Sequence, residues 1–424
     1  MLTISKLKEL SFLVYGLGLS GQSVIKFFKK NNIKKFKVWD DKQKFILKDK
    51  RTKNLKKTLN EVDYIVLSPG IDPKKKNLLK FKKKFITDID FLYLTNDKFK
   101  SIVVTGTNGK STTCKLISHL LKKNKFEVLL GGNIGTPILD LKIKKNPYVV
   151  IEASSFQLAH SKFIKPDFAL LLNISNDHLD WHGSMNNYIN SKLKIFKLQK
   201  KNQFGLINNN FKKIFQKRKF ESKLIIPKLL CYKKIKNIIK NKYLRLSIND
   251  ENMNFVYRLS TLLKISDKKF IKAINSFVGL SHRYEFFLKK KNIIFINDSK
   301  ATSFEATKYA LLNSKNIYWI LGGLPKKNDK ILLSGIKQNI IKCYLVGKNI
   351  NFFKNQIKDK INFSITKNLK KTIKEIFKDI KLHKRKNNTV LLSPAAASYD
   401  QFQNFKKRGN EFKKLSKLYA RKII

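Results

Sequence analysis

The chain has few cysteines and no long apolar segment. Its three cysteines, Cys114, Cys231 and Cys343, are scattered without the spacing of a metal site, which is typical of a reducing compartment. No run of 18 apolar residues occurs, and the N-terminus lacks the apolar core of a signal peptide. We therefore expect a cytoplasmic protein with no membrane partner.

Acidic residues are also scarce: 29 Asp and Glu stand against 91 Lys and Arg, giving a formal net charge of +62. Such a charge suits nucleic-acid binding. The lysines, however, are spread along the whole chain with many Asn, Ile and Phe, while only 17 Gly and 8 Pro occur. This mixture indicates drift towards A/T-rich codons and not a dedicated surface. We predict no specific nucleic-acid partner, and a basic nucleic-acid-binding ATPase stays as an alternative.

Three successive regions alternate apolar strands with helices, which indicates an α/β fold with parallel sheets. The length of 424 residues, 42% of them hydrophobic, predicts two or three folded domains. We place them at residues 1–93, 94–280 and 281–424. Strands are expected at 11–15, 36–40, 64–68, 102–104, 128–130, 148–151, 168–173, 204–208, 293–297, 317–321, 343–346 and 389–392. Helices are expected at 21–30, 113–123, 261–277 and 369–380, whereas 201–250 carries few signals.

The most informative segment runs from Lys100 to Thr113, where an apolar strand ends in a glycine loop. The loop and the following helix start contain Gly106, Thr107, Asn108, Gly109, Lys110, Ser111 and Thr112. Backbone N–H groups at the positive end of a helix attract phosphate oxygens. The lysine of such a loop reaches the terminal phosphates, and a Ser or Thr hydroxyl binds the accompanying Mg²⁺. The segment predicts a nucleoside triphosphate site.

A second glycine motif, residues 16–21, lies between the first strand and the first helix, and Asp40 and Asp41 follow the second strand. This spacing is typical of dinucleotide binding, in which an acidic residue binds a ribose. Several ligands use the same turn, so the motif supports only a phosphate-bearing ligand near Leu19 and Ser20. A NAD-dependent oxidoreductase remains an alternative.

Two strands after the phosphate loop end in polar residues: one delivers Glu152, and the other leads to Asn173 and His178. Parallel sheets bind ligands at the carboxyl ends of their strands. Glu152 is therefore placed to hold a metal ion that bridges phosphates, with His178 as a further ligand. Lys192 follows in a helix, where by itself it is one lysine among many.

Further polar residues follow strands of the third domain. Arg283 and Asp298 could reach a nucleotide, while Lys300 and Thr302 could bind an anionic substrate. Ser398 follows a strand through small residues, and the N–H groups around it form a candidate carboxylate pocket.

In this order the motifs resemble the Mur ligases of peptidoglycan synthesis. The loop Thr105–Thr112 matches that superfamily and is also similar to the loop of folylpolyglutamate synthetases, the nearest alternative. Motifs at 16–21, 68–70, 131–135, 154–158, 297–302, 393–402 and 408–412 resemble the members that join D-glutamate to UDP-N-acetylmuramoyl-L-alanine. The resemblance covers essentially the whole chain and is weakest at 201–250.

The resemblance implies a Rossmann-like UDP-binding domain, a central P-loop ATPase with a parallel sheet, and a Rossmann-like C-terminal domain that binds the amino acid. The implied ligase is a monomer that uses ATP, UDP-N-acetylmuramoyl-L-alanine and D-glutamate. ATP phosphorylates the substrate carboxylate with the help of two Mg²⁺ ions, and the amine of D-glutamate then attacks the acyl phosphate.

The resemblance also implies roles for individual residues. The UDP-sugar would contact Leu19, Ser20, Asp41, Gly70 and Asn133. ATP would contact Gly106, Thr107, Asn108, Gly109, Lys110, Ser111, Thr112, Asn252, Arg283 and Asp298. Catalysis would depend on Lys110, Glu152, His178 and Lys192, and the metal ligands would be Ser111, Glu152, His178 and a carbamylated Lys192. The amino acid would contact Lys300, Thr302, Lys326, Ser398, Tyr399 and Phe405.

Overall fold

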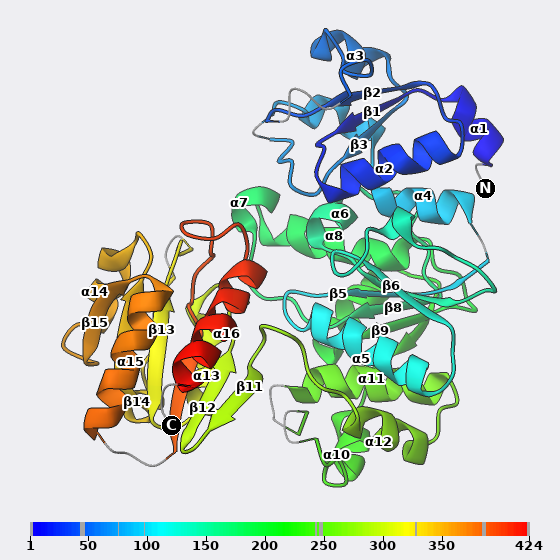
Figure 1. Cartoon of the computed structure of the whole chain (residues 1–424). Helices are drawn as coiled ribbons and strands as arrows, with labels where there is room; N and C mark the ends of the chain where they lie inside the picture. The colour runs from blue at the N-terminus through cyan, green and yellow to red at the C-terminus, as the bar shows by residue number, and fades with distance from the viewer. Residues whose placement is uncertain are drawn as a thin grey trace. The chain divides into compact units, whose positions relative to one another are not determined.

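The computed structural model describes residues 3–42, 47–74, 76–96, 98–241, 244–245, 249–326, 329–383 and 387–421. The chain divides into two compact units, Met1–Phe277 and Val278–Ile424. The first unit contains two sheets and the second contains one (Figure 1). The predicted α/β class is confirmed, whereas the domain boundaries at 93/94 and 280/281 stay predictions.

The first sheet has the strand order β2-β1-β3-β4, and all its pairs are parallel. Its strands are β1 (Phe12–Tyr15), β2 (Phe36–Trp39), β3 (Tyr64–Leu67) and β4 (Phe85–Ile86), with helices α1 (Ile4–Glu9), α2 (Leu19–Lys30) and α3 (Leu55–Glu61). Successive strand residues point to opposite faces. Phe12 therefore packs with Phe28 of α2, and Leu13 with Leu59 of α3.

The second sheet is also parallel and has the order β10-β9-β8-β5-β7-β6. Its strands are β5 (Lys100–Thr105), β6 (Val128–Gly132), β7 (Tyr148–Glu152), β8 (Phe168–Leu171), β9 (Phe204–Ile207) and β10 (Lys223–Ile225). One apolar core joins the sheet to α5 (Lys110–Lys123), α10 (Leu229–Lys236), α11 (Asp250–Leu262) and α12 (Asp267–Asn275). Another joins it to α4 (Asp88–Thr95), α6 (Ser155–His160), α8 (Met185–Lys197) and α9 (Lys212–Lys217).

The second unit holds the sheet β11-β12-β16-β13-β14-β15, in which β11 alone is antiparallel to its neighbour. Its strands are β11 (Glu285–Lys290), β12 (Ile293–Asn297), β13 (Ile317–Gly322), β14 (Ile340–Val346), β15 (Phe363–Lys367) and β16 (Asn388–Leu392). One core contains residues of α13 (Phe304–Leu312) and α14 (Ile350–Ile357). The other contains residues of α15 (Leu369–His383) and α16 (Phe405–Arg421).

The prediction of one helix over 261–277 is wrong. That stretch contains the end of α11 and all of α12, and the chain between them turns at Lys264, whose φ is +56°. Ser266 then caps α12, with Asp267 in the first turn, a combination that favours a new helix start. Residues 201–250 likewise contain α9 and α10, which the sequence pattern did not indicate.

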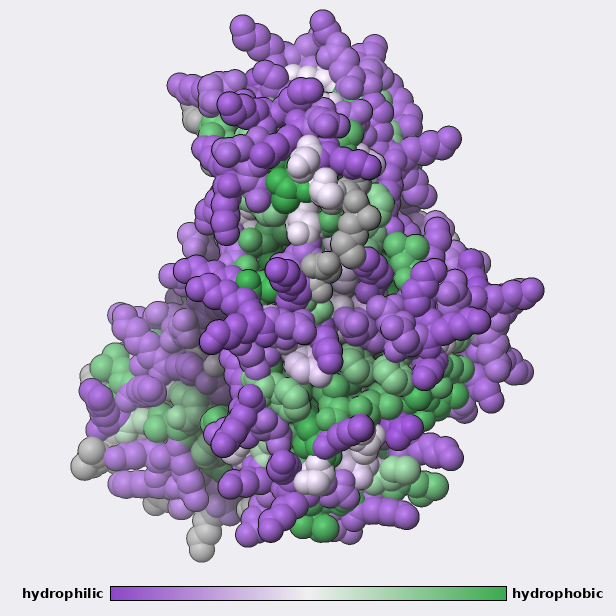
Figure 2. Space-filling view, turned by 90° about the vertical axis from the view of Figure 1, so that its right-hand side faces the viewer, coloured by the Kyte–Doolittle hydropathy of each residue, from purple (hydrophilic) through white to green (hydrophobic). Residues whose placement is uncertain are grey.

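The surface is largely polar on the face shown in Figure 2. Hydrophilic residues cover most of that face, and apolar residues are exposed in smaller areas between them. This agrees with lysines distributed along the whole chain. Among the helices that the structure describes, none has the length and apolar character needed to cross a bilayer.

Candidate active site

The phosphate loop connects β5 to α5 and closes at Gly109, the residue that caps α5. Gly109 has a φ of +82°, and a Cβ there would lie 2.1 Å from Oδ1 of Asn252. Only glycine suits both the backbone angle and this close approach. The same Oδ1 accepts a hydrogen bond from Oγ1 of Thr113 at 3.2 Å. The structure thus brings Asn252, suggested by the family resemblance, against the loop.

Two N–H groups of the loop are held by Asn173, which follows β8. Thr107 N donates to the Asn173 carbonyl oxygen (2.9 Å), and Asn108 N donates to Oδ1 of the same residue (2.8 Å). Nζ of Lys110 folds back onto the carbonyl oxygens of Gly106 (2.7 Å) and Thr107 (2.8 Å). The N–H groups at the start of α5 are therefore the part of the loop best suited to phosphate.

Lys192 lies beside this loop and is buried, with 1% of its surface exposed. Its Nζ donates to the Gly106 carbonyl oxygen at 2.8 Å, the same atom that accepts from Lys110, and lies 4.6 Å from the ring centre of Tyr188. Burial, and then the charge of Lys110, lowers the pKa of Lys192 to about 6. The amine is therefore largely neutral and nucleophilic at pH 7.

The buried amine of Lys192 predicts a pH dependence of folding. Its pKa falls from 10.5 to about 6 on folding, so the unfolded chain binds more protons between these values. The contribution of Lys192 to the free energy of unfolding should therefore rise with pH across this window. We expect Lys192→Met to flatten that rise in urea unfolding from pH 6 to 10 in CO₂-free buffer. Lys197→Met, exposed on the same helix, is the control; an unchanged pH profile in Lys192→Met would contradict the prediction.

Glu152 ends β7 one strand away from the loop, because β7 pairs with β5 and Glu152 aligns with Val104. Its side chain is 2% exposed. Oε1 accepts a hydrogen bond from Nδ2 of Asn133 at 3.0 Å, whereas Oε2 is buried without a hydrogen-bond partner. A buried carboxylate oxygen without a partner is costly, so Oε2 is suited to bind a ligand or a water molecule. Glu152 and Asn133, predicted for different ligands, are thus neighbours.

His178 is joined to the same site through aromatic contacts. Its ring lies 4.7 Å from that of Phe156, which follows Glu152 in the chain, and 6.4 Å from that of Tyr188. The Tyr188 hydroxyl is 3.0 Å from Oγ1 of Thr107. Tyr188 therefore contacts His178, Lys192 and the phosphate loop, a role that no local sequence pattern indicated.

The part of the chain that the structure describes contains no conventional acidic metal cluster. Within the described ranges, no group of three or more His, Cys, Asp or Glu residues is arranged to hold a metal ion. Of the four predicted metal ligands, only Glu152 and His178 belong to these types. The other two, Ser111 and Lys192, lie in the first turn of α5 and against the Gly106 carbonyl oxygen.

The first glycine motif forms a tight turn after β1. A Cβ on Gly21 would lie 2.0 Å from the Gly16 carbonyl oxygen. The buried Asp40 accepts hydrogen bonds from Leu17 N (2.7 Å) and Lys42 N (2.8 Å), so it fixes this loop. Both oxygens of Asp40 thus have a structural role in this turn, and its expected role as a ribose-binding acid stays a prediction.

The neighbouring Asp41, predicted to bind the UDP-sugar, accepts hydrogen bonds from Tyr15 Oη (3.1 Å) and Trp39 Nε1 (3.0 Å) and pairs with Lys76 (3.0 Å). Partial burial raises the pKa of Asp41, but the bonds from Lys76, Trp39 and Tyr15 outweigh it and hold the pKa below its usual value. Of the other predicted residues, Leu19 and Gly70 are exposed, and the Ser20 hydroxyl interacts with Asp88 of α4.

In the second unit, Asp298 follows β12 and is buried. Its carboxylate accepts hydrogen bonds from Tyr284 N (3.0 Å) and Ser393 Oγ (2.7 Å), and burial raises its pKa to about 7. Arg283 precedes Tyr284, and its charge acts on Asp298. Asp298 therefore fixes the segment that carries Arg283.

Arg408 links the two loops that carry predicted amino-acid-binding residues. Nε donates to Ser299 Oγ (3.0 Å), and Nη2 donates to the carbonyl oxygens of Ser299 and Ala396, both at 2.8 Å. Ser299 precedes Lys300, and Ala396 precedes Ser398 by two positions. The sequence showed Arg408 only as part of a motif.

The residues predicted to bind the amino acid are Lys300, Thr302, Lys326, Ser398, Tyr399 and Phe405. Nζ of Lys300 lies 5.6 Å from the Phe405 ring centre, Ser398 is buried, and Tyr399 is exposed. Asp329, three residues after the exposed Lys326, accepts a hydrogen bond from Phe304 N (2.9 Å) at the start of α13, two residues after Thr302.

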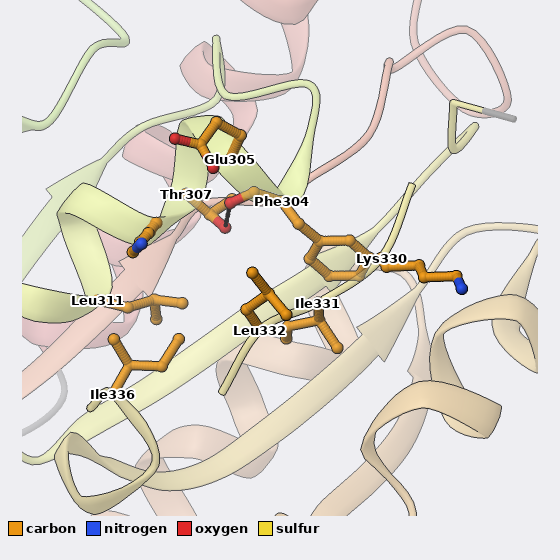
Figure 3. Close-up of a pocket in the computed structure, with 9 residues that line it drawn as sticks. Phe304, Glu305, Thr307, Leu311, Lys330, Ile331, Leu332 and Ile336 are labelled. Atoms are coloured by element: carbon orange, nitrogen blue, oxygen red, sulfur yellow. Dashed lines mark hydrogen bonds between the residues drawn. The ribbon is translucent and has the colours of Figure 1, made fainter. Parts of the chain in front are cut away.

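A cavity of about 30 Å³ lies under α13, lined mainly by apolar side chains such as Phe304, Leu311 and Ile331 (Figure 3). It has room for a water molecule or two and is too small for an amino acid. We therefore do not assign it to a substrate.

The chain is similar to known ligases over most of its length. The family model for the Mur ligase middle domain matches residues 104–264, and that for the MurD-like N-terminal domain matches residues 10–89. A UDP-N-acetylmuramoylalanine–D-glutamate ligase of Rickettsia felis is 36% identical over 401 residues, covering 89% of this chain and 87% of the relative. The ligase of the same name from Rickettsia prowazekii is 36% identical over 438 residues, covering 95% and 97%. The crystal structure of the MurF ligase of Thermotoga maritima with ADP aligns with a TM-score of 0.55 and 15% identity, covering 100% of this chain and 98% of that one.

Proposed function

Because this chain belongs to the Mur ligase family, we propose that it is the ATP-dependent ligase that joins D-glutamate to UDP-N-acetylmuramoyl-L-alanine. The observation that carries this proposal is the similarity, over nearly the full length, to relatives that bear this activity in their names. The geometry supports it, since Lys192 contacts the phosphate loop and Glu152 ends the strand next to the one that leads into the loop. The Asp40 carboxylate, which the NAD alternative would need for a ribose, binds the backbone N–H groups of Leu17 and Lys42.

ATP would bind at the start of α5. The N–H groups from Gly109 to Thr112 and the ammonium of Lys110 would contact its phosphates, with Asn252 beside Gly109. To do so, Lys110 has to exchange its bonds to Gly106 and Thr107 for phosphate oxygens. Arg283 and Asp298 belong to this proposal as further ATP-binding residues, with Asp298 fixing the Arg283 segment.

The residues around Glu152 fit a magnesium ion. Its buried Oε2 has no hydrogen-bond partner, and carboxylate and hydroxyl oxygens are ligands that Mg²⁺ prefers. Ser111, Glu152 and His178 would hold magnesium, and two ions are proposed in all. Bound magnesium neutralises phosphate charge, which favours the approach of an anionic carboxylate.

Carbamylation of Lys192 would complete this ligand set. The neutral amine attacks CO₂, a C–N bond forms and one proton is released. The product is a carbamate, which carries a negative charge on two oxygens. The low pKa of the amine favours this step, and the burial of Lys192 shields the product from water. An unmodified cationic lysine would repel magnesium, and the carbamate would bind it.

The reaction would follow from these positions. An oxygen of the substrate carboxylate attacks the γ-phosphorus of ATP, ADP leaves, and an acyl phosphate forms. The amine of D-glutamate then attacks the acyl carbon, phosphate leaves, and the nitrogen loses a proton. Lys110 would stabilise the transferring phosphoryl group. Lys300, Thr302, Lys326, Ser398, Tyr399 and Phe405 are the residues proposed to position D-glutamate.

The test is release of inorganic phosphate with UDP-N-acetylmuramoyl-L-alanine and a panel of amino acids. We expect turnover that requires both this substrate and D-glutamate, with little activity on L-glutamate. Folate substrates with L-glutamate, and DNA or RNA without an acceptor, are the comparison arms. Turnover with the folate substrates but not with UDP-N-acetylmuramoyl-L-alanine would support a folate-type ligase. Turnover with DNA or RNA alone would support a nucleic-acid-dependent ATPase. Either result would contradict the proposal.

A further inference from the structure

We propose that Glu251 is a positioning residue for the phosphate loop, acting through the side chain of Asn173. This inference rests on the proposed role of the loop in binding ATP. Glu251 lies in the first turn of α11, and its carboxylate binds the amides of two asparagines. Oε2 accepts from Nδ2 of Asn173 at 2.6 Å, and Oε1 accepts from Nδ2 of Asn208 at 2.9 Å.

The bond to Glu251 determines which end of the Asn173 amide faces the loop. A carboxylate only accepts hydrogen bonds, so the NH₂ group of Asn173 has to point towards Glu251. Oδ1 of Asn173 then faces the loop, where it accepts from Asn108 N at 2.8 Å. Both hydrogen bonds of the Asn173 side chain require the same orientation of its amide. The bond to the Glu251 carboxylate is charge-assisted and short.

The position of Glu251 in the fold allows it to act on several strand ends at once. Strands β9, β8 and β5 are neighbours in the sheet, and Asn208, Asn173 and the phosphate loop follow them in that order. Glu251 joins the first two directly and reaches the loop through Asn173. The next residue, Asn252, contacts the other end of the loop at Gly109. The first turn of α11 thus holds both ends of the loop.

These hydrogen bonds order the phosphate loop before ATP binds. Asn173 holds the N–H groups of Thr107 and Asn108, which fixes the path of the loop into α5. A loop that is already ordered loses less conformational freedom on binding. Without the carboxylate, the Asn173 amide can rotate and present NH₂ to the N–H of Asn108, which breaks the contact. The consequence is weaker ATP binding with little change in the other substrates.

The experiment compares Glu251→Ala, Asn173→Ala and the double variant with the full-length wild type. Glu221→Ala, which removes an exposed carboxylate of the same unit, is the control. We expect Glu251→Ala to raise the ATP Kd and KM by about 10-fold or more, because losing a hydrogen bond to a charged group changes an equilibrium by this order. The KM values for UDP-N-acetylmuramoyl-L-alanine and D-glutamate, and the thermal midpoint, should stay close to wild type. The double variant should bind ATP no more weakly than Asn173→Ala alone, because Glu251 acts through Asn173.

Either of two results on ATP binding would overturn the inference: an unchanged ATP Kd in Glu251→Ala, or additive losses in the double variant. Parallel increases in all three KM values with a fall in the thermal midpoint would also overturn it, since they indicate a purely structural bond between β8 and β9. The ATP Kd is measured by calorimetry without any acceptor substrate. A wild type that binds ATP but does not use the UDP substrate would therefore refute the proposed function and leave this inference standing.

Discussion

Replacing Lys192 by alanine is expected to lower kcat by more than about 100-fold, because even groups outside a metal's own ligands typically change activity 10- to 100-fold. The change removes a buried amine beside the Gly106 carbonyl and, in the proposed carbamylated form, an oxygen ligand. The measurement is phosphate release under saturating ATP, UDP-N-acetylmuramoyl-L-alanine and D-glutamate.

Chemical rescue separates the carbamate from a packing role. Formate, acetate or propionate added to Lys192→Ala can place a carboxylate in the vacated space, so we expect part of the activity to return. The larger side chain of Lys192→Met fills that space and should not be rescued. Lys197→Ala, on the same helix but exposed, should keep wild-type activity. Full activity of Lys192→Ala without any added acid would contradict the carbamate role.

Glu152→Gln is expected to lower kcat by a similar factor of more than about 100 and to raise the Mg²⁺ concentration needed for half-maximal activity. The substitution keeps the shape of the side chain and an oxygen for Asn133, but it removes the negative charge at the unpartnered Oε2. Mg²⁺ titrations at saturating ATP would measure the shift.

Stability provides the control for Glu152. A buried carboxylate oxygen without a partner destabilises the protein in the absence of its ligand, so the urea midpoint of Glu152→Gln should not fall when Mg²⁺ and nucleotide are absent. Glu127→Gln, exposed just before β6, should change neither activity nor midpoint. A strong loss of stability with unchanged Mg²⁺ dependence would show that Glu152 is structural.

The sequence was most informative where the chemistry uses contiguous residues. A glycine loop between a strand and a helix requires only neighbouring residues, so residues 106–112 could be recognised without tertiary structure. The strands beside it were also predicted, because parallel strands buried on both faces are apolar throughout. The helix break at Lys264 was missed, since continuous apolar spacing conceals a left-handed residue between two helices.

Motif spacing was less reliable for the role of single acids. Asp40 stands where a dinucleotide fold has its ribose-binding residue, but the tertiary structure directs it to Leu17 N and Lys42 N. Asp41, its neighbour, is surrounded by Tyr15, Trp39 and Lys76. These contacts determine how an acidic side chain can bind a ligand. Several of them come from residues that are distant in the sequence, so the spacing within a motif does not predict them.

The α/β class, the phosphate loop and the polar residues at the ends of the strands could be predicted from the sequence, because each depends on local backbone geometry or on hydrophobic pattern. The tertiary structure added that Lys192, which the family resemblance had named, is buried beside the loop, and that Glu251 reaches the loop through Asn173. Lys192 and Gly106 are 86 positions apart, and Asn252 and Thr113 are 139 apart. Contacts between such distant residues form only when the chain packs across the sheet. This packing buries Lys192, which lowers the pKa of its amine, and it buries Oε2 of Glu152 without a hydrogen-bond partner.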